Sequence, residues 1–194
     1  TDWGWMWKIP LQNRWGSGYL YNDTMIDDEF IKNEIIRLHK GKDIQINKKI
    51  KFNAGCYEDV WVQNCVAIGL SGGFLEPLEA TSIMTIIFQL QQLPKNICDY
   101  SERDKYNRKV FKFNHQNMLF IRHHYNCSRS DTKFWETYIN KEIPNDLEKI
   151  YKTFHTKNLI FDTLDIDVSY LTFNKNQYKH IFYNNFLKKE KTIL

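Results

Sequence analysis

The chain has 194 residues, of which 42% are hydrophobic and 26% charged, with a formal net charge of +4 at pH 7. This length suffices for one core or for a large part of a bigger domain, and the modest charge does not indicate a nucleic-acid partner. No apolar run reaches the roughly 20 residues of a membrane-spanning helix, and no signal peptide is recognisable. We therefore expect a cytoplasmic protein without a nucleic-acid or membrane partner.

Cysteine and histidine spacing gives no support for a metal site. None of the four cysteines has the CxxC spacing of a zinc or redox motif, so reduced and partly buried thiols are expected. These cysteines are Cys56, Cys65, Cys98 and Cys127. The adjacent His123 and His124 would face different sides of a helix, so they cannot hold one metal ion together and are expected to pack or to lie at the surface.

The first elements predicted along the chain are a hairpin and a helix. Residues 3–10 alternate and end at a proline, and residues 16–22 follow a glycine-containing turn, which predicts two paired strands. Asp27 is a good helix cap, and isoleucine and leucine recur at helical spacing from residue 31 to residue 38. Residues 43–55 are expected to be extended.

The middle of the chain is predicted to form a buried strand, a turn and a second helix. Residues 60–70 are almost continuously apolar, which is typical of a strand covered on both faces. A glycine-rich turn at residues 69–73 follows. Residues 82–94 then predict a helix with one apolar face, ended by a proline. The residues of that face are Ile83, Ile86, Ile87 and Leu90.

The second half of the chain, from residue 100 to residue 156, is predicted to be helical. Residues 106–128 read as one long helix or as two, and two shorter helices follow. The pattern weakens after residue 156. The expected fold class is α/β, with a mixed sheet followed by a helical layer. In this division residues 1–98 carry the sheet and the site, and residues 99–194 form a mainly helical part packed on it.

The loop before the second predicted helix has the features of an anion site. The first-turn N–H groups of a helix that begins at Thr81 and Ser82 lack helical partners, and the helix dipole favours negative charge there. Both residues are also good caps. Glu79 stands just before this start, and a buried carboxylate would need a partner. In the simpler alternative, Glu76 and Glu79 only complement the dipole.

Three sequence motifs occur in order along the chain. Residues 5–10 read WMWKIP, residues 74–81 read FLEPLEAT, and residues 123–135 read HHYNCSRSDTKFW. With these motifs the chain resembles the flavin-dependent tryptophan halogenase family over about residues 3–140. The resemblance implies a portion of an FAD-dependent monooxygenase-like fold of the para-hydroxybenzoate hydroxylase type.

The resemblance also implies a reaction and the residues that perform it. Reduced FAD from a separate flavin reductase, oxygen and chloride or bromide would give hypohalous acid, which halogenates tryptophan or a related indole or aromatic compound. Glu79 matches the catalytic and substrate-binding glutamate, and the backbone of Thr81 and Ser82 matches the halide site. Leu70 and Ile83 match residues that contact the flavin.

The tryptophan signature of the family is also matched. It comprises Trp5, Trp7, Ile9 and Pro10, which the resemblance implies to lie close to the flavin. By pattern alone the tryptophans read as core residues on one strand face, whereas the resemblance favours a wall between flavin and substrate. Three positions depart from the family pattern: Ser82 replaces a common glycine, Ala80 a frequent serine, and Cys56 a common arginine.

Two features of the family are not found in these residues. They are the GxGxxG turn for the dinucleotide and the catalytic lysine, which precedes the tryptophan signature in the family. We therefore expect a C-terminal portion of a larger enzyme, inactive by itself and compatible with a homodimer. Residues 170–186 are the expected place of the segment that holds the substrate backbone. The alternatives are an FAD-dependent hydroxylase of the same fold and a non-catalytic remnant that acts only as a binding module.

Overall fold

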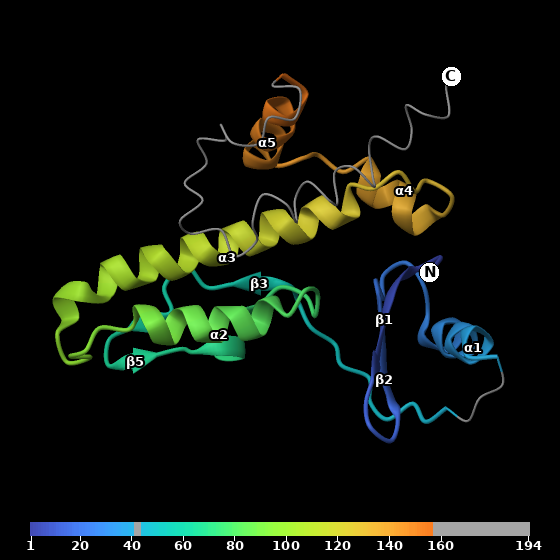
Figure 1. The fold of residues 1–194 in the computed structure, drawn as a ribbon, viewed down its shortest axis with the longest axis horizontal. Helices are drawn as coiled ribbons and strands as arrows, with labels where there is room; N and C mark the ends of the chain where they lie inside the picture. The colour runs from blue at the N-terminus through green and yellow to red at the C-terminus, as the bar shows by residue number, and fades with distance from the viewer. Residues whose placement is uncertain (41–43, 157–194) are drawn as a thin grey trace. The chain divides into compact units, whose positions relative to one another are not determined.

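The computed structural model describes residues 1–40 and 44–156 and divides them into two compact units (Figure 1). The first unit, called the hairpin unit here, comprises Thr1–Ile50 and Tyr125–Glu142. The second, called the helical unit, comprises residues 51–124 and, in its described part, residues 143–156. The domain boundary expected at residue 98 differs from this division into units and stays a prediction. The expected substrate-backbone segment at residues 170–186 lies outside the described residues.

The hairpin unit contains the predicted pair of strands and the predicted first helix. Strand β1 (Gly4–Pro10) pairs antiparallel with β2 (Trp15–Tyr21) over their whole length. Helix α1 (Asp28–Leu38) begins as predicted after Asp27, whose carboxylate accepts a hydrogen bond of 2.8 Å from the Phe30 N–H. The Tyr19 hydroxyl of β2 donates to the buried Glu34 carboxylate of α1 at 2.6 Å, which fastens the helix to the hairpin.

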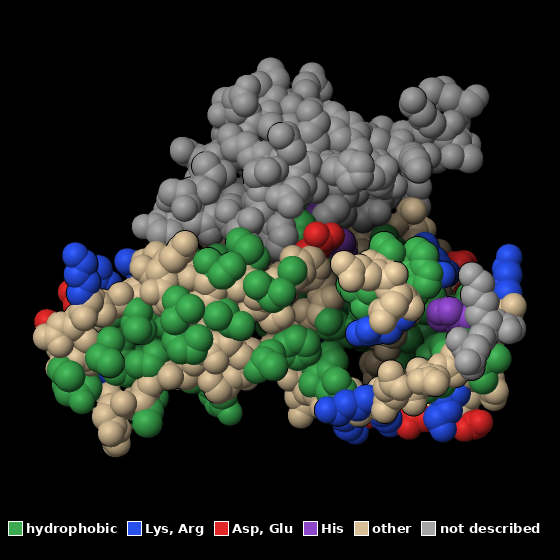
Figure 2. All heavy atoms as spheres, turned by 60° about the horizontal axis from the view of Figure 1, so that its bottom comes forward, with side chains coloured by type: hydrophobic (Ala, Val, Ile, Leu, Met, Phe, Trp, Pro, Cys, Tyr) green, Lys and Arg blue, Asp and Glu red, His purple; other side chains and the backbone are tan. Residues whose placement is uncertain are grey.

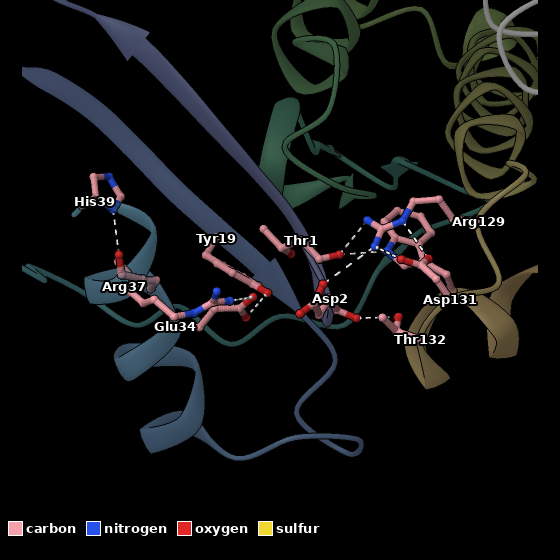
Figure 3. A network of polar contacts seen from close by, with 11 residues as sticks. Thr1, Asp2, Tyr19, Glu34, Arg37, His39, Arg129, Asp131 and Thr132 are labelled. Carbon is pink, nitrogen blue, oxygen red and sulfur yellow. Dashed lines mark hydrogen bonds and ion pairs between the residues drawn. The ribbon is translucent and has the colours of Figure 1, made fainter.

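A second set of polar contacts fixes the beginning of β1 (Figure 3). The Thr1 carbonyl accepts hydrogen bonds from the Arg129 guanidinium at 2.8 Å and from the Trp135 indole, in helix α4 (Lys133–Ile139), at 2.9 Å. The Thr132 hydroxyl donates to the Asp2 carbonyl at 2.7 Å. Because two chain segments about 130 positions apart are joined here, the start of β1 has a defined place within this unit.

The described part of the helical unit contains three helices and short strands. Its helices are α2 (Thr81–Gln92), α3 (Arg103–Tyr125, whose last residue belongs to the hairpin unit) and α5 (Asn145–Thr156). Its strands form two antiparallel pairs, β3 (Gly55–Cys56) with β6 (Gly73–Phe74), and β4 (Trp61–Val62) with β5 (Cys65–Val66). Single turns of 3-10 helix are η1 (Gly69–Ser71) and η2 (Tyr100–Glu102).

The strand predicted at residues 60–70 is wrong. The chain turns back between β4 and β5, where Gln63 has a positive φ of 51°, and then enters η1. The polar pair Gln63 and Asn64 supplies this turn inside an otherwise apolar run. The fold class is α/β as expected, although the strands of the described residues form three separate antiparallel pairs and no mixed sheet. Residues 103–125 form one long helix.

The core of the helical unit joins β4 to α3. Trp61 and Tyr106 are almost fully buried, with ring centroids 5.8 Å apart. The Asn107 side chain of α3 accepts a hydrogen bond from the Trp61 N–H at 2.8 Å and donates to the Trp61 carbonyl at 3.0 Å. The amide thereby satisfies the backbone of a strand too short to satisfy itself.

Helix α2 directs polar side chains to the interior and apolar side chains to the surface, which is the reverse of the usual arrangement. Its buried positions are Thr81, Thr85 and Gln89, at four-residue spacing. The predicted apolar face exists, but Ile83 is 59% exposed and Leu90 is 57% exposed. Figure 2 shows hydrophobic side chains gathered on this side of the helical unit. An apolar stripe of this kind normally faces a partner surface.

The buried Gln89 amide holds the turn that precedes β6. Its oxygen accepts a hydrogen bond of 2.7 Å from the Gly69 N–H, and its nitrogen donates to the Ala67 carbonyl at 3.2 Å. Gly69 has a φ of +64°, and a Cβ at this position would lie 2.8 Å from the Ile86 side chain. The turn therefore requires glycine at 69 and an amide at 89.

We expect Gln89→Leu to lower the free energy of unfolding by about 2 to 4 kcal/mol, because it leaves a buried N–H and a buried carbonyl unpaired. Urea denaturation of the variant and of the parent chain measures this difference. Gln91→Leu, at an exposed position of the same helix, is the matched control and should change stability little. Equal effects of both substitutions would show that the Gln89 contacts do not stabilise the turn.

Candidate functional site

The residues that the sequence predicts for the reaction lie in both units. The signature residues Trp5, Trp7, Ile9 and Pro10 are on β1 in the hairpin unit. The residues expected to contact flavin, halide and substrate are in the helical unit, in η1, in α2 and in the loop between β6 and α2. These are Leu70, Glu79, Thr81, Ser82 and Ile83. Each group is described within its own unit.

Two consecutive residues with left-handed backbone lead into α2. Glu79 has a φ of 53° and Ala80 a φ of 55°. Neither is glycine, and such conformations cost on the order of 1–3 kcal/mol each, so they persist where the surrounding structure enforces them. They cluster at functional sites in proteins. This strained turn brings the Glu79 carboxylate next to the beginning of the helix.

The beginning of α2 is confirmed at Thr81, but the expected cap is wrong. The N-cap position is Ala80, which has no side chain to cap the helix. The Thr81 hydroxyl instead donates to the Leu78 carbonyl at 3.0 Å, because Thr81 already lies inside the first turn. Since the helix start is left without a side-chain acceptor, its N–H groups are more available to a ligand.

The two N–H groups expected to hold a halide differ in their bonding. The Thr81 N–H donates to the Leu78 carbonyl at 3.2 Å, and the Ile83 N–H donates to the Ala80 carbonyl at 3.0 Å. Between them, the Ser82 N–H has no acceptor among the described residues. Ser82 is therefore the open donor of this helix start, and Thr81 is already engaged.

A small cavity of about 10 Å³ adjoins the same helix start. Its volume corresponds to about one water-sized guest. It is lined by Cys56, Gly73, Phe74, Leu75, Thr81, Ser82, Thr85 and Asn114. None of these described lining residues has a carboxylate, and burial raises the pKa of the Cys56 thiol, which keeps that group neutral. The cavity is consequently free of negative charge from its lining.

The Glu79 side chain is 49% exposed and lies near a histidine of α3. The distance from its Oε1 atom to Nε2 of His124 is 3.9 Å. Sequence reasoning missed this pairing, because no spacing rule connects residue 79 with residue 124. His123 points elsewhere: it is fully buried, and its Nδ1 atom lies 2.7 Å from the Tyr151 hydroxyl of α5. The packing role expected for His123 is thus confirmed.

The residues expected to contact flavin are open to the surface. Leu70 is 67% exposed on η1, and Ile83 belongs to the exposed apolar face of α2. Large exposed apolar side chains beside a helix start suit a flat aromatic ligand. No group of three metal-ligating side chains occurs among the described residues, and the four cysteines are free thiols.

The signature tryptophans are held by contacts within the hairpin unit. Their rings lie 5.7 Å apart at a 50° angle. The Trp5 indole donates to the Tyr125 hydroxyl at 2.9 Å. Trp7 lies opposite Gly18 of β2, where a Cβ would be 1.9 Å from the indole ring. The glycine of the second strand therefore makes room for the second signature tryptophan.

Comparison with known proteins shows extensive similarity to halogenases. The family model described as tryptophan halogenase matches residues 1–190. The tryptophan 7-halogenase KtzQ of Kutzneria sp. (strain 744) is 36% identical over 147 residues, which are 73% of this chain and 27% of that protein. The tryptophan 7-halogenase RebH of Lentzea aerocolonigenes is 36% identical over 146 residues, covering 72% of this chain and 27% of that protein.

Solved structures show the same fold. The tryptophan 6-halogenase SttH of Streptomyces toxytricini has a TM-score of 0.84 at 28% identity, over 95% of this chain and 38% of that one. BrvH, a flavin-dependent halogenase from Brevundimonas sp. BAL3, has a TM-score of 0.83 at 29% identity, over 94% of this chain and 37% of that one. The chain thus spans 27% to 38% of the length of these relatives.

No helix in the described part of the chain combines the length and the apolar character that crossing a bilayer requires. The tryptophan motif on β1, the loop and helix start at residues 74–82, and the match over residues 1–190 agree with one another. On this evidence the chain belongs to the flavin-dependent tryptophan halogenase family.

Proposed function

We propose that this chain provides the halide-binding helix start and the substrate-side carboxylate of a flavin-dependent halogenase that acts on tryptophan or a related indole. The observation that supports this most directly is the strained turn at Glu79 and Ala80, which puts a carboxylate beside an uncapped helix start. Because the chain spans only part of the length of its relatives, the complete reaction requires the remaining polypeptide. A cytoplasmic location and a homodimer stay predictions.

The proposed halide site uses backbone donors at the start of α2. The open N–H of Ser82 and the positive end of the helix dipole both favour an anion. The adjoining cavity has room for a small guest and no carboxylate among its described lining residues. Since the Thr81 N–H is shared with the Leu78 carbonyl, Ser82 is the principal donor in this proposal, and chloride or bromide is the ion.

The proposed cofactor is FAD, with reduced flavin supplied by a separate reductase. The exposed Leu70 and Ile83 side chains of the helical unit fit a flat ring. When bound, reduced FAD and oxygen supply the oxidising power that converts the halide to hypohalous acid. In this proposal the chain contributes apolar contacts from η1 and α2, and its halide site lies on α2 next to Ile83.

Glu79 is proposed to act on the substrate side. An aromatic carbon that accepts a halogen must subsequently lose its proton, and a carboxylate within reach can take that proton and orient the oxidant. The half-exposed position of Glu79 leaves its oxygens accessible to a ligand. A hydroxylase of the same fold would need no N–H group to bind a halide. Dependence of product formation on halide therefore distinguishes the two functions.

In the complete enzyme, Glu79→Gln should lower the rate of halogenation by roughly 100-fold or more, because it removes the proton acceptor and conserves size. Flavin oxidation should continue at its normal rate. Product formation and flavin oxidation are measured in parallel, with Glu58→Gln at an exposed position as the control. Equal losses of both rates in Glu79→Gln would assign Glu79 a structural role instead.

Ser82→Pro should raise the halide concentration for half-maximal activity by roughly tenfold or more, since a hydrogen bond to a charged group contributes about 1.5–3 kcal/mol. Proline removes the N–H but is tolerated in the first turn of a helix. Ser82→Ala retains the N–H and serves as control, with thermal unfolding recorded for both variants. Anomalous scattering from bromide-soaked crystals should place the ion within hydrogen-bond reach of the Ser82 nitrogen, and bromide found only elsewhere would refute the assignment.

The isolated 194-residue chain should bind FAD weakly or not at all, because the sequence contains no GxGxxG turn to hold the dinucleotide. Calorimetric titration of the chain with FAD measures this directly. The complete enzyme, titrated under the same conditions, should show saturable binding. Tight stoichiometric binding by the chain alone would place the main flavin contacts within these residues.

A further inference from the structure

The orientation of the His124 ring is determined by its own helix. Its Nδ1 atom lies 2.9 Å from the Phe120 carbonyl oxygen, one helical turn earlier. A carbonyl only accepts hydrogen bonds, so Nδ1 carries a hydrogen in the neutral as well as the charged ring. The Phe120 ring meets the imidazole edge to face at 4.7 Å and restricts its rotation. The second nitrogen, Nε2, therefore points away from Phe120 in a defined direction.

The neutral imidazole presents a lone pair toward Glu79. Neutral histidine has a single N–H, which Nδ1 uses, so Nε2 is an acceptor. Its neighbour at 3.9 Å is Oε1 of Glu79, which is an acceptor too when the carboxyl group is ionised. Two facing acceptors make a bond only when a proton is added between them, directly or through a bridging water. The pair is built to receive one proton.

We propose that His124 is a positioning residue that acts through Glu79, orienting its carboxylate and taking over the proton that Glu79 receives from the substrate. This inference rests on the substrate-side role of Glu79 proposed above. It assigns a function to a histidine that the sequence motif contains but that spacing alone did not connect to the site. His124 does not itself touch the substrate in this proposal.

The proposed step is balanced in atoms and electrons. The aromatic carbon attacks the halogen of hypohalous acid, so the carbon–halogen bond forms and the oxygen–halogen bond breaks with release of hydroxide. The C–H electron pair then returns to the ring, and the proton passes to a Glu79 oxygen and on to Nε2 of His124. Once the imidazolium releases it, this proton neutralises the hydroxide, and water is the by-product.

The surroundings of His124 keep it ready to accept a proton. Burial lowers the pKa of His124 below its ordinary value, while the Phe120 carbonyl and the Glu79 carboxylate raise it in part. On its own helix its neighbours are Arg122 and His123, and Tyr151 of α5 faces those two residues. The charged group that acts on His124 from another described segment is Glu79.

The sign of the pH dependence follows from this environment. Above the lowered pKa of His124 the ring is neutral and can accept the proton from Glu79. Below it the imidazolium already pairs with the carboxylate, so the acceptor is lost and halogenation should decline on the acid side. In a variant that has no titrating group at position 124, other groups should determine how the halogenation rate declines at acid pH.

A first experiment measures the coupling of the two residues without measuring activity. In the complete enzyme labelled with ¹³C-histidine, NMR titration follows each ring, and the resonance missing in His124→Gln identifies His124. Glu79→Gln should lower the pKa of His124 further, because it removes a charge that favours the imidazolium. An unchanged pKa of His124 in Glu79→Gln would overturn the pairing.

A second experiment measures the consequence for the reaction. His124→Gln retains a polar side chain at this position but cannot take up a proton. We expect kcat for halogenation to fall about 10- to 100-fold, with little change in the substrate KM or in flavin oxidation, and the acid side of the kcat profile to shift. His115→Gln, on the same helix and away from Glu79, is the matched control. An unaltered kcat and pH profile in His124→Gln would overturn the proposal.

The two proposals fail in distinguishable ways. If Glu79→Gln does not reduce halogenation, the substrate-side role of Glu79 fails, and the relay to His124 fails with it. If Glu79→Gln abolishes halogenation and His124→Gln leaves rate and profile unchanged, only the role of His124 fails. If both variants lose halogenation, retain flavin oxidation and show the coupled NMR titration, the inference is supported.

Discussion

The buried amide of Gln89 is the contact on which the helical unit depends. Three hydrogen bonds converge on this residue: its side chain bonds the backbone of Gly69 and Ala67, and its own carbonyl accepts from the Tyr106 hydroxyl at 3.3 Å. Such a buried amide must keep all its partners, because an unpaired group in the interior is costly. The inner face of α2 is thereby committed to polar residues, and its three isoleucines and Leu90 lie on the outer face.

The same polar face stabilises the start of α2. The Thr85 hydroxyl donates to the Thr81 carbonyl at 3.0 Å and lies 3.3 Å from the Asn114 side chain of α3. Together with the bond from the Thr81 hydroxyl to the Leu78 carbonyl, these contacts hold the first turn from inside. Their combined stabilisation offsets the backbone strain at residues 79–80. The Ser82 N–H and the Glu79 carboxylate take no part in this network.

Features encoded by neighbouring residues were predictable from the sequence, and features that depend on distant contacts were not. The Asp27 cap and the helix start at Thr81 are local, and both were found at the expected residue. The single strand predicted for residues 60–70 was wrong because the two polar residues of this run make a turn. Hydrophobicity alone does not distinguish one strand from a tight hairpin. The contact between Glu79 and His124 requires α2 and α3 to be packed, which no local pattern specifies.

The outward apolar face of α2 has a consequence for handling the protein. In a preparation of these 194 residues alone, isoleucine and leucine side chains on this face are in contact with water, and apolar surface gains about 25 cal/mol per Å² when it is covered. Self-association and precipitation at high concentration follow naturally from such a patch. Replacing these side chains with charged ones to improve solubility would also remove the apolar surface next to Ser82, the residue proposed to bind halide, so solubility and the proposed site place opposed demands on the same helix.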